Sequence, residues 1–125
     1  MADLIAAIRR ARQVNVEAGG FTFTVRRPTD LEVVQLQNDG LSAAELVQRF
    51  VIGWQGVQEI HLVPGGTSVA VPFDAALWRE WIADQPDLWA PISSAIMQSY
   101  AAHRAALEDA AKNSPPGSNP PNSTD

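Results

Sequence analysis

Histidine is the side chain that proteins use most often for proton transfer and metal binding near neutral pH, and this chain has two, His61 and His103. Helical metal sites space their ligands as His-x-x-x-His or Glu-x-x-His. Neither histidine has a second plausible ligand at such a spacing. We therefore expect no metal or catalytic role for either, and we interpret His103 as a half-buried helix residue beside Tyr100 and Leu107.

Paired carboxylates and glycine-rich loops are the other candidates for chemistry. Asp84 and Asp87 flank Pro86, where helix capping already explains acidic side chains better than general acid–base work does. Neither Gly19-Gly20 nor Gly65-Gly66 is followed by a lysine or opens a helix, as a phosphate-binding loop must. The chain has no cysteine, which removes thiolate nucleophiles and thiolate metal sites. We expect no catalytic residue, no metal, no cofactor and no enzymatic activity.

The charge balance bears on the class of partner. The chain has 14 acidic and 9 basic residues, a formal net charge of −5, so its overall field repels phosphate backbones. No apolar run approaches the roughly 18 residues of a membrane span, and the first ten residues lack the pattern of a secretory signal. We therefore expect a soluble intracellular protein that binds neither nucleic acid nor membrane.

Arginines cluster in two short segments near the start of the chain. If the first helix lies on the hairpin that follows it, these side chains form a basic patch suited to an acidic partner. We favour the other interpretation, a solvated face without a function, because most surface charge has no further role. The arginines concerned are Arg9, Arg10, Arg12, Arg26 and Arg27.

Tryptophan is abundant for a chain of 125 residues, with four copies, all at apolar-face positions or element ends. Most are expected in the core. Trp89 is the expected exception, because the adjacent Leu88 and Trp89 cannot both point the same way, and an exposed aromatic side chain is a typical anchor for a partner. The residues that we nominate for protein binding are Trp89, Tyr100, Trp54 and Trp81.

The N-terminal third has two recognisable elements. Residues 3–12 form a short amphipathic helix whose apolar side, Leu4, Ile5 and Ile8, must be buried by the rest of the fold. Residues 14–17 and 21–26 alternate with period two around a glycine turn, which predicts a β-hairpin. Its buried face is expected to hold Val14, Val16, Phe21, Phe23 and Val25.

Capping signals locate the helices that follow. Thr29 with Glu32, and Ser42 with Glu45, match capping boxes. The first box opens a helix to about residue 37, and the second opens one ending near residue 53 or 56. The apolar stripe of that second helix would hold Val47, Phe50, Val51 and Trp54.

The C-terminal half is predicted as a loop with weak strands, two helices and a tail. The loop covers residues 57–72. Asp74 caps a helix that ends at residues 85–87, and the longest helix follows from Leu88 to about Lys112, with Pro91 tolerable only in a first turn. Residues 114–125 have four prolines and no aliphatic or aromatic side chain, which predicts disorder.

Together these elements predict an α+β fold that is mostly α. The N-terminal helix and hairpin pack against about four helices in a single globular domain at residues 1–113, and a disordered Pro-rich tail covers 114–125.

Four segments, in this order and spacing, resemble the tail assembly chaperones of long-tailed, siphovirus-type bacteriophages and prophages. The resemblance covers roughly residues 14 to 112 and includes a Gly-Trp-x-Gly-Val segment followed by Pro-Phe. The segments are Phe21-Thr-Phe-Thr-Val-Arg-Arg-Pro-Thr29, Val51-Ile-Gly-Trp-Gln-Gly-Val57, Val71-Pro-Phe-Asp74 and Trp81-Ile-Ala-Asp-Gln-Pro-Asp-Leu88.

The resemblance implies a small β element with helices behind it and a role in keeping the tape measure protein soluble. It implies action in the host cytoplasm, displacement by the tail tube protein and absence from the finished virion, with no catalytic residue. A homo-oligomer fits the role, because coating a long helix takes many copies. The alternative is a structural virion protein, such as a head–tail connector or minor tail protein. A small enzyme would instead require polar groups converging in one pocket.

Overall fold

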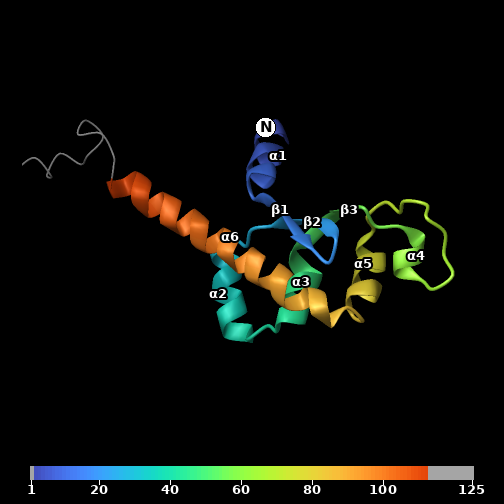
Figure 1. The fold of residues 1–125 in the computed structure, drawn as a ribbon. Coiled ribbons are helices and arrows are strands. Elements are labelled where there is room, and N and C mark those ends of the chain that lie inside the picture. The colour runs from blue at the N-terminus through green and yellow to red at the C-terminus, as the bar shows by residue number, and fades with distance from the viewer. Residues whose placement is uncertain (1, 113–125) are drawn as a thin grey trace, which may run out of the picture.

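The computed structural model describes residues 2–112, which form a small sheet and a set of helices (Figure 1). The elements are α1 (Ala2–Ala11), β1 (Gln13–Ala18), β2 (Phe21–Arg26), α2 (Asp30–Asp39), α3 (Ala43–Phe50), β3 (Val51–Gln55), α4 (Glu59–Leu62), α5 (Ala75–Ile82) and α6 (Pro86–Lys112). The predicted α+β, mostly α fold class is confirmed. The predicted disordered tail, residues 114–125, lies outside the described residues.

The sheet is antiparallel with strand order β1-β2-β3. β1 and β2 form the predicted hairpin, in which Ala18 pairs with Phe21 across a two-residue turn. Gly19 and Gly20 both have positive φ, 60° and 84°, as a tight hairpin turn of this kind requires. On the face toward the helices Phe23 and Val25 are fully buried, whereas Val14, at the far end of β1, is exposed.

The third strand was not predicted, because its apolar spacing imitates a helix. α3 ends at Phe50 and the chain continues as β3, which pairs with β2. Val25 pairs with Val51 but Thr24 pairs with Gly53, so Ile52 is an extra residue that bulges from the strand. The bulge places Val51 and Trp54, three residues apart, on the same buried face. The predicted continuation of α3 to residue 53 or 56 is therefore wrong.

The capping signals are confirmed. In both predicted capping boxes the hydroxyl accepts from the glutamate N–H and the glutamate side chain accepts from the cap N–H, at Thr29 with Glu32 and at Ser42 with Glu45. Asp74 accepts from two backbone N–H groups at the start of α5. These caps satisfy donors that a helix start leaves unpaired, so the helix starts can be located from local sequence.

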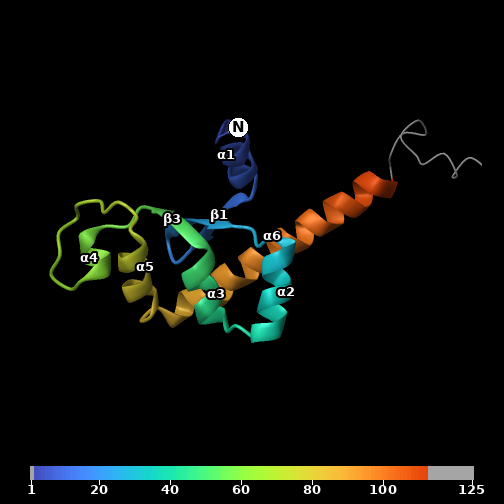
Figure 2. The same ribbon diagram turned by 180° about the vertical axis from the view of Figure 1, so that it is seen from behind.

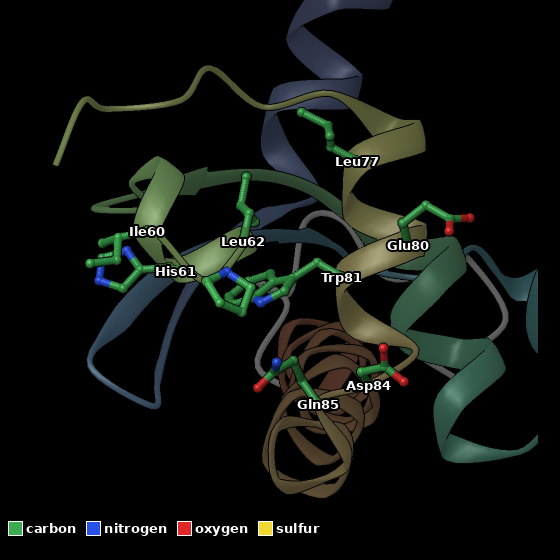
Figure 3. A pocket seen from close by; sticks show the side chains of 9 residues that line it. Ile60, His61, Leu62, Leu77, Glu80, Trp81, Asp84 and Gln85 are labelled. Carbon is green, nitrogen blue, oxygen red and sulfur yellow. The ribbon is translucent and has the colours of Figure 1, made fainter. Parts of the chain in front are cut away.

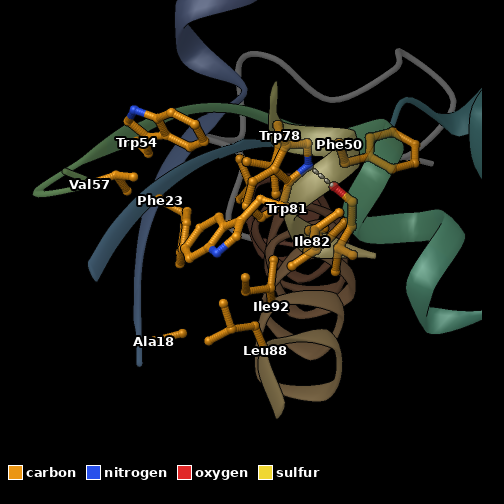
Figure 4. Close-up of a cluster of buried hydrophobic side chains, with 14 of the residues drawn as sticks. Ala18, Phe23, Phe50, Trp54, Val57, Trp78, Trp81, Ile82, Leu88 and Ile92 are labelled. Carbon is orange, nitrogen blue, oxygen red and sulfur yellow. Dashed lines mark hydrogen bonds between the residues drawn. The ribbon is translucent and has the colours of Figure 1, made fainter. Parts of the chain in front are cut away.

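The core lies between the sheet and helices α3, α5 and α6 (Figures 1 and 4). Trp78 is its largest fully buried side chain, and its Nε1 donates a hydrogen bond of 3.0 Å to the carbonyl oxygen of Val47 on α3. Its ring also packs on Phe23 of the sheet, with centroids 5.3 Å apart. Trp78 thus joins α5 to both α3 and β2.

Three other predictions need correction. The predicted loop at 57–72 contains the single-turn helix α4 and a bridge between Gln58 and Ala70. α6 begins at Pro86 rather than Leu88, so Pro91 lies in the second turn and not in the first. Proline has no backbone N–H to bond the carbonyl oxygen of Asp87, four residues earlier, and both residues are exposed at the surface, where water can reach that carbonyl.

The apolar side of α1 is the largest departure from the predicted fold. Leu4, Ile5 and Ile8 were expected to be buried, but 61%, 53% and 46% of their surfaces are exposed. Seen from the front and from behind, α1 leaves the sheet and points away from the other helices (Figures 1 and 2). Among the helices of residues 2–112, none is both long enough and apolar enough to cross a membrane.

Candidate protein-binding surface

Two of the nominated aromatic residues belong to the core. Trp54 and Trp81 are each only 8% exposed, and their rings meet edge to face with centroids 6.0 Å apart. Trp54 Nε1 also donates to the carbonyl oxygen of Val71 over 2.7 Å. Side chains held in this way do not project as exposed anchors, although Trp81 also lines a surface cleft, and the nomination of both for protein binding stays a prediction.

Trp89, the residue expected to be most exposed, is half-buried. Its Nε1 donates a hydrogen bond of 2.7 Å to the carbonyl oxygen of Ile82, at the end of α5, and its ring packs against the core. The adjacent Leu88 is buried beneath the hairpin turn, beside Gly19. Adjacent helical residues point about 100° apart, so each can reach a different part of the same core.

Tyr100 joins α6 to the start of α2. Its hydroxyl donates to Asp30 Oδ1 over 2.7 Å, and Arg104 lies 3.6 Å from the same carboxylate. The hydrogen bond from Tyr100, together with the nearby charge of Arg104, lowers the pKa of Asp30. The same hydrogen bond raises the pKa of Tyr100, because losing the proton would bring two negative charges together.

The histidines have structural surroundings. His61 Nδ1 accepts a hydrogen bond of 2.8 Å from the backbone N–H of Gln58, and the ring meets Phe21 edge to face at 4.9 Å. His103 is half-buried on α6, as predicted. Within residues 2–112, no group of three histidine, cysteine, aspartate or glutamate side chains is arranged to hold a metal ion.

A cleft lies between α4 and α5 (Figure 3). It is open to solvent and has a volume of about 330 Å³. Its apolar lining comes from Ile60, Leu62, Pro64, Leu77 and Trp81. Ile60 and Leu77 are substantially exposed, which is uncommon for side chains of this kind gathered around one hollow.

Two of the four polar residues that line the cleft are acidic. Glu80 lies on α5, Asp84 lies just after its end, and both are exposed. Within the part of the chain that the structure describes, neither carboxylate forms an ion pair. Trp81 Nε1, on the same helix, is buried without a hydrogen-bond partner. The cleft therefore suits an apolar ligand that carries positive charge.

Backbone hydrogen bonds hold the α4 side of the cleft in place. The N–H of Glu59 donates to Val69 O and the N–H of Val71 donates to Val57 O, each over 2.9 Å. Glu59 Oε1 accepts from the N–H of Thr67 over 2.8 Å. A side chain at Gly66 would meet the backbone of Glu59 at 2.8 Å, so the loop approaches α4 too closely for any residue but glycine.

The five arginines that could form a basic patch, if the first helix lay on the hairpin, are divided between different roles. Arg26 pairs bidentately with Glu32 and lies over the ring of Phe50. Arg27 donates to the carbonyl oxygen of Pro28, and burial lowers its pKa. Arg9 and Arg12 line a hollow of about 400 Å³ together with Arg26, but α1 does not lie along the hairpin.

Sequence reasoning missed the cleft because it interpreted residues 57–72 as a loop. The signal in the sequence is a short cluster of apolar residues, Ile60, Leu62 and Val63, and Ile60 and Val63 are exposed. Comparison of the chain with protein-family models, with curated proteins and with solved structures finds no match.

Proposed function

We propose that this chain is a tail assembly chaperone of a long-tailed bacteriophage or prophage, which binds the tape measure protein through the cleft between α4 and α5. The observation that carries the proposal is that the four segments of the family resemblance meet through aromatic contacts beside this cleft, which the fourth segment lines. They are distant in sequence, from residue 21 to residue 88, yet their aromatic side chains contact one another.

The contacts between these segments are specific. From the first segment, Phe21 meets Trp81 of the fourth edge to face at 5.4 Å. From the second, Trp54 packs against Phe73 of the third at 5.1 Å and binds the carbonyl oxygen of Val71. The fourth supplies Trp81, Asp84 and Gln85 to the cleft itself. The four segments thus form one aromatic cluster, and Trp81 joins that cluster to the cleft.

The mechanism follows from the chemistry of the surface. A tape measure protein is expected to have long amphipathic helices that aggregate when their apolar faces are exposed before the tail tube encloses them. The cleft would take apolar side chains from such a helix, and Glu80 and Asp84 would pair with its basic residues. Binding through one small cleft is weak enough for tail tube subunits to displace the chaperone.

Co-expression with the tape measure protein of the same phage tests the proposal. The wild-type chain is expected to keep the tape measure protein in the soluble fraction and to co-purify with it. Leu77→Glu places a charge in the cleft and should abolish both effects. Leu31→Glu is the matched control, because Leu31 is an exposed helical leucine on α2, away from the cleft, and it should behave as the wild type.

The contradicting result is a tape measure protein that is equally soluble with and without this chain. A second measurement concerns the site of action, which we propose to be the host cytoplasm. Mass spectrometry of purified virions should find the tape measure protein and lack this chain. Finding this chain at a stoichiometric level would favour a structural virion protein instead.

A further inference from the structure

The exposed stripe of α1 is an apolar surface without a partner in its own chain. Leu4, Ile5 and Ile8 lie on one side of the helix, and each is close to half exposed or more. Arg9 continues the same side toward the C-terminal end of α1, and Arg10 lies on the opposite side. A ten-residue helix is too short to be stable in water through propensity alone, so packing of its apolar side would stabilise it.

The stripe cannot reach the α4–α5 cleft of its own chain. Only Arg12 lies between α1 and β1. Both its backbone N–H and its backbone carbonyl oxygen form hydrogen bonds. The N–H of Arg12 donates to Arg9 O over 3.2 Å, and Arg12 O accepts from the N–H of Arg27 over 2.7 Å. α1 joins β1 at Gln13, whereas the cleft adjoins Phe21 at the opposite end of the hairpin. α1 therefore points away from the cleft (Figure 1).

The stripe and the cleft are both apolar, and the charged residues beside them have opposite signs. Three of the nine basic residues of this acidic chain are Arg9, Arg10 and Arg12. The cleft carries Glu80 and Asp84 beside its apolar lining. Among residues 2–112, none of these five charged side chains takes part in an ion pair. An apolar helix with cations at one end thus matches an apolar cleft with two free carboxylates.

We propose that α1 of one copy docks into the α4–α5 cleft of a second copy, so that free protein associates head to tail and covers the cleft until a client helix replaces α1. Donor and acceptor surfaces differ, so the contact is heterologous and each added copy leaves one α1 and one cleft open. One short helix buries little area, so association is weak and depends on concentration. The inference rests on the proposed role of the cleft as a helix-binding surface, but not on the identity of the client.

Sedimentation velocity of the purified full chain over a wide concentration range tests the inference. The wild-type mean mass should rise continuously with concentration. Ile5→Glu with Ile8→Glu, which removes the stripe, should stay monomeric, and so should Leu77→Glu, which blocks the cleft. All three side chains are substantially exposed, and circular dichroism checks that each variant is folded. Leu31→Glu should associate as the wild type does.

Mixing the two monomeric variants is the decisive step. The stripe variant keeps a cleft and the cleft variant keeps a stripe, so together they should form a 1:1 dimer that grows no further. Charge reversal gives a second test: Arg9→Glu and Glu80→Arg should each weaken association at least several-fold. Mixing them should restore concentration-dependent growth, because the stripe of each variant then meets a cleft of opposite charge on the other.

Three results would overturn the inference. They are a wild-type chain that is monomeric at every concentration, a cleft variant that still associates, and a mixture that stays monomeric. If the wild type is monomeric while Leu77→Glu still abolishes tape measure binding, the self-association is wrong and the proposed function stands. If the chain associates as described but leaves the tape measure protein insoluble, the self-association stands and the proposed function is wrong.

Discussion

At the scale of single residues, Glu32 has the densest set of polar contacts in the described chain. It accepts two hydrogen bonds from Arg26, at 2.8 and 2.9 Å, and one from the N–H of Thr29 at 3.0 Å. Burial alone would raise the pKa of Glu32, but the hydrogen bonds from Arg26 and Thr29 and the charges of Arg26 and Arg49 lower it below its usual range. This carboxylate therefore joins β2, α2 and the end of α3.

Glu32→Gln tests that role. The substitution removes the charge and at least one hydrogen bond, and it should lower the free energy of unfolding at pH 7 by about 1–3 kcal/mol. Glu45→Gln is the control, because Glu45 is exposed and caps only its own helix, and its effect should stay within about 0.5 kcal/mol. Urea denaturation measures both, and equal effects would contradict the account.

The lowered pKa of Glu32 also gives a pH dependence of defined sign. A carboxyl group whose folded pKa lies below its unfolded value stabilises the fold fully above the unfolded value, roughly 4.3, and loses that contribution as pH falls through the folded pKa. Between pH 7 and pH 3 the wild type should therefore lose more stability than Glu32→Gln. Parallel losses in urea titrations at the two pH values would show that Glu32 does not contribute.

At the scale of elements, the hairpin turn rests on the start of α6. A Cβ atom at Gly19 would lie 2.7 Å from Leu88 Cδ2, whereas one at Gly20 would meet nothing within 4 Å. Both glycines have positive φ, so alanine at either should cost about 1–2 kcal/mol. Gly19→Ala should cost about 1–3 kcal/mol more than Gly20→Ala, because Leu88 must move. Thermal or urea unfolding of both variants checks this difference, and equal losses would mean that the turn does not contact α6.

α6 has a packed half and a projecting half. Ile96 is fully buried against the core, whereas Leu107, further along nearly the same side, is exposed on the part that extends beyond α2 (Figure 2). Ile96→Ala should lower the free energy of unfolding by about 2–5 kcal/mol, and Leu107→Ala by no more than about 0.5 kcal/mol. Hydrogen exchange should be fast beyond Arg104. A large effect at Leu107 would indicate packing that the structure does not contain.

Elements whose signals are local could be predicted, and those set by tertiary contacts could not. The capping boxes, the glycine turn and the strand alternation each act within a few residues, and all were identified correctly. The sequence does not indicate β3, because the bulge at Ile52 changes the spacing between buried residues of this strand from two residues to three. The cleft was missed for a related reason, since the backbone bonds between Glu59 and Val69 that position α4 join residues ten apart.

For the whole molecule, the composition indicates that apolar contacts dominate the behaviour of the protein. It does not indicate which apolar side chains are exposed. Amphipathic α1 carries an apolar stripe whether that stripe packs on its own domain or on another molecule, so its sequence alone did not distinguish the two. The tryptophans raise the same ambiguity. A large aromatic residue fills a core or an interface equally well, and here Trp54 and Trp81 pack in the core, Trp89 is half-buried against it, and Trp81 also lines the cleft.

The indole N–H resonances of the four tryptophans report, residue by residue, whether the α4–α5 cleft receives a helix of the tape measure protein as proposed. Trp81 lines the cleft, whereas the indole of Trp78 is bonded to Val47 within the core. Titrating the ¹⁵N-labelled chain with a soluble helical fragment of the tape measure protein should shift the Trp81 resonance and leave that of Trp78 in place, and Leu77→Glu should abolish the shift. A fragment that binds without moving Trp81, or that binds Leu77→Glu equally well, would contradict the claim.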